Sequence, residues 1–253
     1  MQKRTKKWGI AAVIATSIAA TALWVQAGSN EESQIRQRLT QAVPKANIVS
    51  VTASPIAGVY AVELDGGTIY ASADGQYLIQ GDMLQVKGKE VVNITDQAKS
   101  KQRLVLLKGI DKRDEIIFPA KGKAKAVITV FTDTDCGYCR KLHAEVPAMN
   151  AKGIEVRYLA YPRDLPRVGP NAGTGAHMTE IWCNANRAQA LTLAKQGRPV
   201  PAGKADCKAP ISEQFALGRQ MGVTGTPAIF NEKGEQIGGY ITADRAATIL
   251  GLN

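Results

Sequence analysis

Two cysteines separated by two residues lie between an apolar run and a stretch with helical periodicity. The apolar run covers residues 126–131, and the helical pattern begins with Cys136-Gly137-Tyr138-Cys139 and continues to Asn150. Helix N-terminal amides stabilise a thiolate, and a dithiol with this spacing can close and reopen as a disulfide. The sequence therefore predicts a strand that leads into a helix and carries thiol–disulfide exchange chemistry at the turn.

The segments after this helix predict how the sheet continues. Two strands, a short strand and a final helix are expected at Ile154–Tyr161, Pro227–Asn231, Gln236–Gly239 and Ala243–Leu250. This order predicts a mixed sheet with helices on its faces, interrupted by a long, mostly helical region. In the first helix apolar residues repeat at helical spacing from Cys139, so we expect Cys139 to be buried and Cys136 to carry the exposed sulfur.

The first part of the chain predicts a separate small domain. Ile35, Leu39 and Val43 recur at helical spacing, and turn signals such as Asp74-Gly75 separate short strand patterns between residues 59 and 92. A helix and a sheet of this size enclose little core, so we expect pairing with a second copy, with residues 77–81 as the candidate edge. Residues 96–110 then predict an exposed linker helix with one apolar stripe.

Basic residues before an apolar run form the pattern of an export signal. The run covers residues 8–25 and follows four basic side chains, Lys3, Arg4, Lys6 and Lys7. Val25-Gln26-Ala27 fits a cleavage site and Ala20-Thr21-Ala22 is a second candidate, so we expect residues 1–27 to be removed as a signal peptide. The alternative is an uncleaved membrane anchor. Export predicts an oxidising compartment, where cysteine pairs persist as disulfides.

Charge and cysteine spacing disfavour two other classes of function. The net charge is +10, of which the signal contributes four, and the remaining 10 − 4 = +6 is spread without interleaved aromatic residues, unlike a nucleic-acid interface. The other two cysteines, Cys183 and Cys207, do not form a second Cys-x-x-Cys, as a structural zinc site would require. We interpret them as a structural disulfide, because apolar Ile181-Trp182 precedes Cys183 and a loop-like segment precedes Cys207. We expect no metal and no cofactor.

Three stretches of the chain, Phe131–His143, Val156–Arg163 and Gly222–Ala228, carry a family resemblance. They are similar to the DsbC/DsbG family of bacterial periplasmic disulfide isomerases, and the similarity spans nearly all of the exported chain. The resemblance implies an α+β and α/β architecture of three parts. These are a cystatin-like helix-plus-antiparallel-sheet dimerisation domain over residues 28–95, a linker helix over 96–115, and a thioredoxin fold with a helical insertion over 116–253.

The resemblance also implies partners and a second half of the site. It implies a V-shaped homodimer with an apolar cleft, misoxidised or unfolded exported proteins as substrates, and a membrane thiol reductase of the DsbD type. In thioredoxin-like folds the proline matching Pro227 is cis and abuts the dithiol, so the backbone of Thr226 is expected to bind extended substrate; the bland alternative is that Pro227 simply starts a strand. The family pair that matches Cys183 and Cys207 is a structural disulfide.

The expected chemistry starts with a thiolate at Cys136. Its attack on a wrong disulfide forms a mixed disulfide, which either a substrate thiol or Cys139 resolves. The first outcome is isomerisation and the second is reduction of the substrate. The alternatives are a thiol oxidase or specialised reductase, and a holdase chaperone whose dithiol is secondary.

The active-site loop departs from the family pattern. Asp135 directly precedes Cys136 in the loop that continues with Gly137 and Tyr138. The family commonly has an apolar residue and then Thr before the first cysteine, whereas this chain has Thr134 and then Asp135. We expect Asp135 to cap the helix and to raise the pKa of Cys136 by like charge, so that Asp135→Thr would make Cys136 more acidic. The Gly- and Pro-containing segment 164–178 also diverges. His143 lies two turns beyond Cys136 on the same helix, which favours a structural or surface role over proton transfer.

Overall fold

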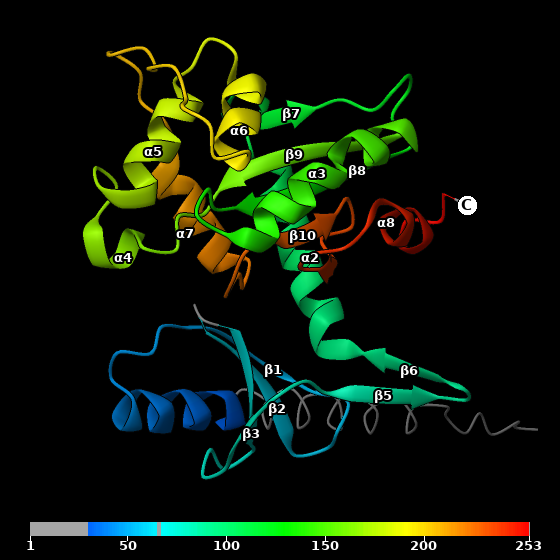
Figure 1. The fold of residues 1–253 in the computed structure, drawn as a ribbon. Coiled ribbons are helices and arrows are strands. Elements are labelled where there is room, and N and C mark those ends of the chain that lie inside the picture. Colours follow the sequence, from blue (N-terminus) through cyan, green and yellow to red (C-terminus); the bar gives the residue numbers. More distant parts are fainter. Residues whose placement is uncertain (1–29, 65–66, 253) are drawn as a thin grey trace, which may run out of the picture. The chain divides into compact units, whose positions relative to one another are not determined.

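The computed structural model describes residues 30–64 and 67–252, which form two compact units on either side of the Gly81–Asp82 boundary (Figure 1). The expected signal peptide, residues 1–27, lies outside the described residues. Among the helices that are described, none is both long and apolar enough to cross a membrane.

The first unit is a helix with a four-stranded antiparallel sheet. The described part of the helix covers residues 30–42. The strands follow in sequence order as β1 (Ile48–Ala53), β2 (Val59–Leu64), β3 (Gly67–Ser72) and β4 (Leu78–Gln80). Ile35 and Leu39 of the helix pack on Val51, Tyr60, Val62 and Ala71 of the sheet.

Sequence periodicity predicted this unit with two errors. Val43 lies beyond the helix and is exposed, so the apolar stripe ends at Leu39. Strand β1 was not predicted, because Ser50 and Thr52 alternate with its apolar residues on a half-exposed edge. The Asp74-Gly75 turn is present, with Gly75 at φ +67°, and a Cβ there would lie 3.2 Å from the backbone of Ile35. Glycine is therefore required both by the turn and by the close helix.

The second unit begins with a hairpin, β5 (Leu84–Lys87) and β6 (Glu90–Asn93), that leads into α2 (Ile94–Lys108). A five-stranded sheet and its helices follow. In chain order they are β7 (Ile116–Phe118), β8 (Ala126–Thr132), α3 (Gly137–Ala151), β9 (Ile154–Ala160), α4 (Leu165–Val168), α5 (Gly173–Trp182), α6 (Arg187–Lys195), α7 (Ile211–Gln220), β10 (Ala228–Asn231), β11 (Gln236–Gly238) and α8 (Ala243–Ile249).

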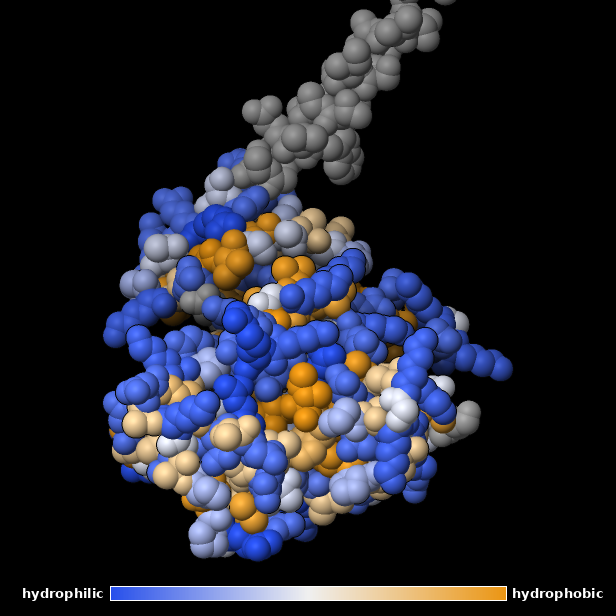
Figure 2. Space-filling model, turned by 90° about the horizontal axis from the view of Figure 1, so that it is seen from above, coloured by the Kyte–Doolittle hydropathy of each residue, from blue (hydrophilic) through white to orange (hydrophobic). Residues whose placement is uncertain are grey.

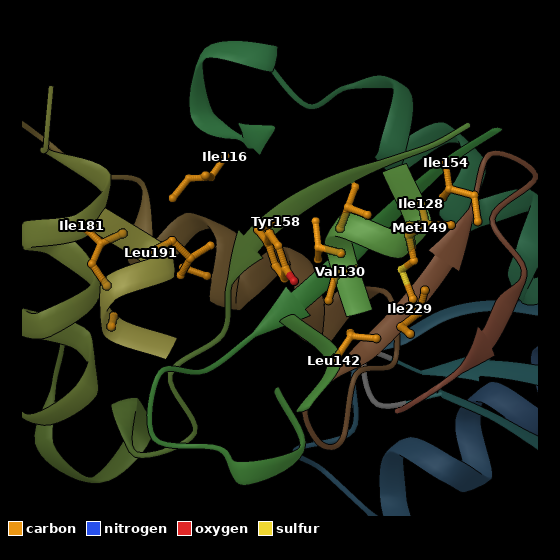
Figure 3. Packing of buried hydrophobic residues seen from close by; sticks show 14 of the residues in the cluster. Ile116, Ile128, Val130, Leu142, Met149, Ile154, Tyr158, Ile181, Leu191 and Ile229 are labelled. Carbon is orange, nitrogen blue, oxygen red and sulfur yellow. The ribbon is translucent and has the colours of Figure 1, made fainter. Parts of the chain in front are cut away.

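The sheet order is β11-β10-β8-β9-β7, with β8 and β9 parallel and the other pairs antiparallel. Residues of β8 and β9 alternate between its two faces, because successive strand side chains point to opposite sides. Val130 and Tyr158 lie with Leu142 of α3 in one apolar layer (Figure 3), whereas Phe131 and Leu159 pack into a second layer on the opposite face. The predicted mixed sheet with helices on its faces is confirmed.

Helix α2 differs from the predicted exposed linker. Its Leu106 and Leu107 pack against the second apolar layer, and Arg103 is buried beneath it. The Arg103 Nε donates to the Met221 carbonyl at 2.9 Å, and the guanidinium lies over the Phe230 ring. Because Arg103 is charged, the pattern of apolar residues did not predict that its side chain is buried. The helix is capped by Asn93, whose side chain accepts from the Asp96 amide.

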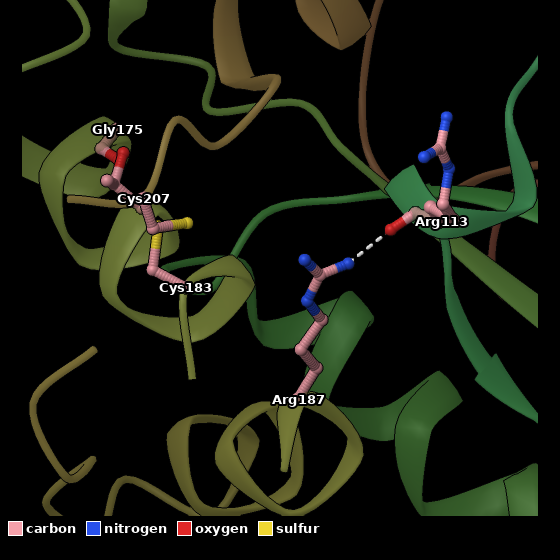
Figure 4. Close-up of a disulfide and its surroundings, with 6 residues drawn as sticks. Arg113, Gly175, Cys183, Arg187 and Cys207 are labelled. Carbon is pink, nitrogen blue, oxygen red and sulfur yellow. Dashed lines mark hydrogen bonds between the residues drawn. A yellow bond between two sulfur atoms is a disulfide. The ribbon is translucent and has the colours of Figure 1, made fainter. Parts of the chain in front are cut away.

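The helical insertion between β9 and α7 is closed by a disulfide. Cys183 at the end of α5 is bonded to Cys207, 24 residues later, and α6 lies inside this loop (Figure 4). Arg187, at the start of α6, donates to the Arg113 carbonyl and so links the insertion to the segment before β7. The loop that contains α6 is thereby closed on itself and bonded to the segment before β7.

One face of the molecule exposes side chains of both kinds, hydrophilic and apolar. Figure 2 shows a face on which hydrophilic side chains predominate, with smaller apolar areas between them. In the first unit, apolar side chains are exposed along β4, the edge strand of its sheet, at Leu78 and Ile79. Such an edge also leaves backbone groups available for pairing.

We expect Arg103→Leu to lower the free energy of unfolding of the second unit by about 1–3 kcal/mol, because the Met221 carbonyl loses its buried donor. Urea unfolding of the whole chain measures the change. Lys101→Leu, which removes one positive charge from an exposed position of the same helix, is the matched control and is expected to have little effect. Equal stability of the two variants would contradict the role of Arg103.

Candidate functional site

The dithiol lies where β8 passes into α3. Cys136 is the N-cap residue of α3 and Cys139 belongs to its first turn, and both are free thiols. The Cys136 Sγ donates to the Thr226 carbonyl at 3.2 Å, although the two residues are 90 positions apart. The Thr226-Pro227 peptide is cis and directly precedes β10. The fold thus places the loop before β10 against the N-terminus of α3.

The predicted difference in exposure between the two sulfurs is wrong. Cys139 is fully buried as expected, but Cys136 is only 4% exposed. Helical periodicity places Cys136 off the buried stripe of α3. Periodicity contains no information about the Thr226 loop, which lies 90 residues away in the sequence and covers Cys136.

The surroundings favour the thiolate of Cys136. Burial acts to raise its pKa, but hydrogen bonds from the Thr226 hydroxyl and from Cys139, together with the Arg163 guanidinium, outweigh burial and lower the pKa below its ordinary value. The Thr226 Oγ1 is buried and has no other hydrogen-bond partner among the described residues, so its proton is available to the Cys136 thiolate. The amides at the start of α3 act in the same direction.

Cys139 has the opposite balance. Its complete burial raises the pKa, which Lys195, the Asp133 backbone and the Thr132 and Thr226 hydroxyls offset only in part. The two thiols therefore differ in reactivity: Cys136 is the more readily ionised, and Cys139 holds its proton more strongly.

Asp133, rather than Asp135, organises the loop before the dithiol. The buried Asp133 carboxylate accepts from the Asp135 amide at 2.8 Å and from the backbone and side chain of Arg163 at 2.9 and 2.8 Å. Asp135 does not cap α3, contrary to expectation, because Cys136 itself occupies the N-cap without a side-chain bond. The Asp135 carboxylate instead points to solvent and pairs with Arg140 at 3.3 Å. The expected effect of the Asp135 charge on the Cys136 pKa stays a prediction.

One side of the dithiol is open. A Cβ built at Gly137 or at Gly225 would meet no atom within 4 Å, so there is free space above both loops. The exposed ring of Tyr138 lies beside this space, with its centroid 6.4 Å from that of Tyr240. An extended peptide can approach here between two aromatic rings and the backbone of Thr226.

Comparison with known proteins agrees with this geometry. A thioredoxin-like domain model matches residues 113–252, and a model of the disulfide bond isomerase protein N-terminal domain matches residues 26–96. A thiol:disulfide interchange protein DsbC from Dickeya dadantii is 42% identical over 187 residues, which are 74% of each chain. The chain belongs to the DsbC family.

Other DsbC relatives support the same assignment. The thiol:disulfide interchange protein DsbC of Escherichia coli K12 is 36% identical over 210 residues, 83% of each chain. Among solved structures, a disulfide interchange protein from Neisseria gonorrhoeae is 27% identical, with a TM-score of 0.48, and the match covers 57% of this chain and 98% of that one. The family assignment rests on the sequence relatives.

His143 has a structural position in this DsbC-family chain. It is buried between two hydroxyls, with Nδ1 3.1 Å from the Tyr158 Oη and Nε2 3.0 Å from the Thr192 Oγ1. Because the Thr192 hydroxyl already donates to the Ala188 carbonyl, it accepts from Nε2–H, and Nδ1 accepts from Tyr158. Burial, with a smaller contribution from Lys195, lowers the pKa of His143 to about 4. The imidazole is thus neutral and contacts neither sulfur.

The divergent segment 164–178 lies beside the active-site loop. A hollow of about 450 Å³ is lined by Asp135, Arg140 and Thr174 together with His177 and Arg198. The Asp164 carboxylate accepts from the Thr174 amide at 3.1 Å and so closes the turn into α5. The second histidine of the chain, His177, therefore lines a surface hollow adjacent to the loop of the dithiol.

Several residues of the site escaped sequence reasoning. Asp133 and Arg163 both lie within the stretches that carry the family resemblance, so their presence at the site could have been expected from it. Thr132 is a polar residue at the end of an otherwise apolar strand, and this polarity could have indicated a place in the site. Lys195, which is buried next to Thr132, gave none, because an ionisable residue in a helical pattern predicts a solvated face.

We expect Thr226→Val to raise the pKa of Cys136, since the hydroxyl that lowers it is removed at nearly constant shape. The rate of Cys136 alkylation, measured against pH, reports the change as a shift of the profile to higher pH. Thr224→Val makes the same substitution at an exposed position two residues away and serves as the control. A profile unchanged by Thr226→Val would contradict the assigned role of the hydroxyl.

His143 predicts a specific pH dependence of stability. Because its pKa is about 4 in the folded chain and about 6.5 in the unfolded one, the unfolded chain binds the extra proton first as the pH falls. Stability is therefore expected to fall between about pH 6.5 and pH 4, by up to about 3 kcal/mol from this group. His143→Gln should flatten this part of a urea-unfolding profile, whereas His177→Gln should leave the slope in place. An equal slope in the His143 variant and the wild type would refute the assignment.

Proposed function

We propose that the chain is a protein disulfide isomerase in which Cys136 attacks and Cys139 resolves. The observation that carries this assignment is the contrast between the two thiols. Cys136, at the helix N-terminus and against Thr226, has a lowered pKa beside an open face, whereas buried Cys139 has a raised one. A first thiol with a lowered pKa and a second thiol with a raised pKa suit a reaction in which the mixed disulfide must persist, because only a small fraction of the second thiol is ionised and able to attack.

The reaction balances without an external oxidant. The Cys136 thiolate attacks one sulfur of a wrong substrate disulfide, a Cys136–substrate disulfide forms, and the other substrate sulfur leaves as a thiolate. If a different substrate thiolate then attacks, Cys136 is released unchanged and the substrate carries a rearranged disulfide. If Cys139 attacks, the substrate leaves reduced and Cys136–Cys139 becomes a disulfide, which a reductase must return to the dithiol.

Thr226 and Pro227 are proposed to bind the substrate backbone. The Thr226 carbonyl is already within hydrogen-bond distance of Cys136, and Pro227 has no amide proton that would compete for a partner. A peptide lying along Thr226 therefore has its sulfur directed at Cys136. Tyr138 supplies apolar contact area beside the opening.

The remaining parts of the proposal concern assembly and location. Residues 28–95 are proposed as the dimerisation domain, 96–115 as the linker and 116–253 as the catalytic domain. The exposed apolar side chains of β4, at the edge of the first unit's sheet, support pairing with a second copy. Residues 1–27 are proposed to direct the protein to the periplasm, where a membrane reductase of the DsbD type keeps the dithiol reduced. Chaperone activity on unfolded chains is proposed to accompany the dimer.

We expect Cys136→Ala to abolish recovery of activity from a scrambled-disulfide substrate, because no mixed disulfide can form. Cys139→Ala is the comparison variant: it should still form the mixed disulfide and accumulate it, as seen on non-reducing gels. A holdase with secondary redox chemistry would suppress aggregation equally in all variants and show no loss of refolding with Cys136→Ala. An oxidase would instead form disulfides in a reduced substrate, lose this activity with Cys136→Ala, and fail to refold the scrambled substrate even as the wild type.

A further inference from the structure

A lysine is buried beneath the dithiol. Lys195, the last residue of α6, is 5% exposed, and its Nζ donates to the Thr132 Oγ1 at 2.7 Å and to the Asp133 carbonyl at 2.8 Å. No carboxylate of the described residues forms an ion pair with it, since the Asp133 carboxylate is bound by Arg163. Burying an ammonium group without a carboxylate partner is unfavourable, so its retention at this position requires another explanation.

Thr132 connects the lysine to Cys139. A hydroxyl carries one proton and can accept as well as donate. Because the Thr132 Oγ1 accepts from Lys195, its own proton is directed elsewhere, and a hydrogen bond from this side chain to Cys139 lowers the pKa of that cysteine. A chain of donors thus runs from Lys195 through Thr132 to the Cys139 sulfur, and every member is buried.

The other charged and titratable groups around the lysine do not replace it. Arg163 is held by Asp133 and Arg140 by Asp135 and the Thr134 carbonyl, so both cations have partners. His143 is held neutral by its burial. Cys136 is the second sulfur of the same dithiol, and its charge acts on Lys195 less than that of Cys139. Arg163 interacts with both cysteines and more with Cys136, whereas Lys195 interacts more with Cys139 than with Cys136.

We propose that Lys195 is a positioning residue whose charge, acting on Cys139 directly and through the Thr132 hydroxyl, stabilises Cys139 as a thiolate, and so sets how fast the mixed disulfide is resolved. This inference rests on the proposed role of Cys139. In the resolving step the Cys139 proton leaves, its thiolate attacks Cys136, the bond from Cys136 to the substrate breaks, and the substrate sulfur departs and takes up a proton. Lys195 stabilises the state in which the proton has left Cys139 and the attack has not yet occurred.

The titration of the lysine agrees with this role. Burial lowers the pKa of Lys195 to about 8, while the Cys139, Asp133 and Cys136 charges act to raise it. The pKa values of Lys195 and Cys139 are thereby closer to each other than the pKa values of a lysine and a cysteine in water. A stronger cation effect would hasten resolution and favour reduction of the substrate; its removal would prolong the mixed disulfide and favour rearrangement.

The first test measures Cys139 alone. In a full-length Cys136→Ala chain, the ultraviolet absorbance of the thiolate is followed against pH, with the Cys136→Ala, Cys139→Ala chain as the blank, so that burial of the sulfur does not obstruct the measurement. Lys195→Met and Thr132→Val should each raise the pKa of Cys139 by roughly one unit. Thr132→Ser, which keeps the hydroxyl, should preserve it, and Lys233→Met removes an equal charge from an exposed turn as the control.

The combination of variants tests the path through Thr132. In the Thr132→Val background, Lys195→Met should shift the Cys139 pKa less than it does alone, because the connecting hydroxyl is already missing and only the direct effect of the charge is left to lose. An unchanged Cys139 pKa in Lys195→Met, or an equal shift with and without Thr132, would overturn the proposal. Both results are independent of enzyme activity.

A second test uses the intact dithiol. A mixed disulfide with a cysteine-containing peptide is expected to persist several-fold longer in Lys195→Met than in the wild type or Lys233→Met, while the rate of Cys136 attack is nearly unchanged. Equal lifetimes in all three chains would overturn the inference. If instead Cys136→Ala retained isomerase activity, the proposed function itself would fail, whatever the pKa of Cys139.

Discussion

The carboxyl end of β8 buries polar groups directly beneath the reactive sulfurs, and each of those groups needs a partner. Thr132 and Asp133 are both almost fully buried; the Thr132 hydroxyl and the Asp133 carbonyl accept from Lys195, and the Asp133 carboxylate accepts from Arg163. An unsatisfied buried polar group costs about 1–3 kcal/mol, so these bonds determine the path of the loop. Because the loop ends at Cys136, the same bonds fix where the dithiol stands relative to the Thr226 carbonyl.

The two partners come from separate parts of the chain. Arg163 follows β9, the parallel neighbour of β8, and reaches the same edge of the sheet because parallel strands end together. Lys195 belongs to the helical insertion and enters from the side. The loop before the dithiol is therefore held by Arg163, which follows a strand of the central sheet, and by Lys195, which belongs to the helical insertion. The site's electrostatics depend on both, since Arg163 lowers the pKa of Cys136 and Lys195 acts on Cys139.

Sequence periodicity predicted the elements that position the site and failed where burial comes from distant segments. The apolar runs of β8 and β9 and the stripe from Cys139 to Met149 were sufficient for the central strands and α3, because each pattern is local. Strands β1 and β7 were missed, since one alternates with polar residues and the other has only three residues. Arg103 and Lys195 are buried cations, and the exposure of Cys136 depends on a loop 90 residues away. No local pattern encodes such contacts, whereas the family resemblance supplied the Thr226 loop.

The disulfide between Cys183 and Cys207 closes the loop that contains α6, and α6 ends with Lys195. The same unit therefore carries one cysteine pair that is joined and one that is free. Under the proposed reaction, Cys183 and Cys207 are oxidised once as the chain matures, whereas Cys136 and Cys139 have to be returned to thiols after each reduction of a substrate. The reductant that does so has to discriminate between two cysteine pairs of one unit.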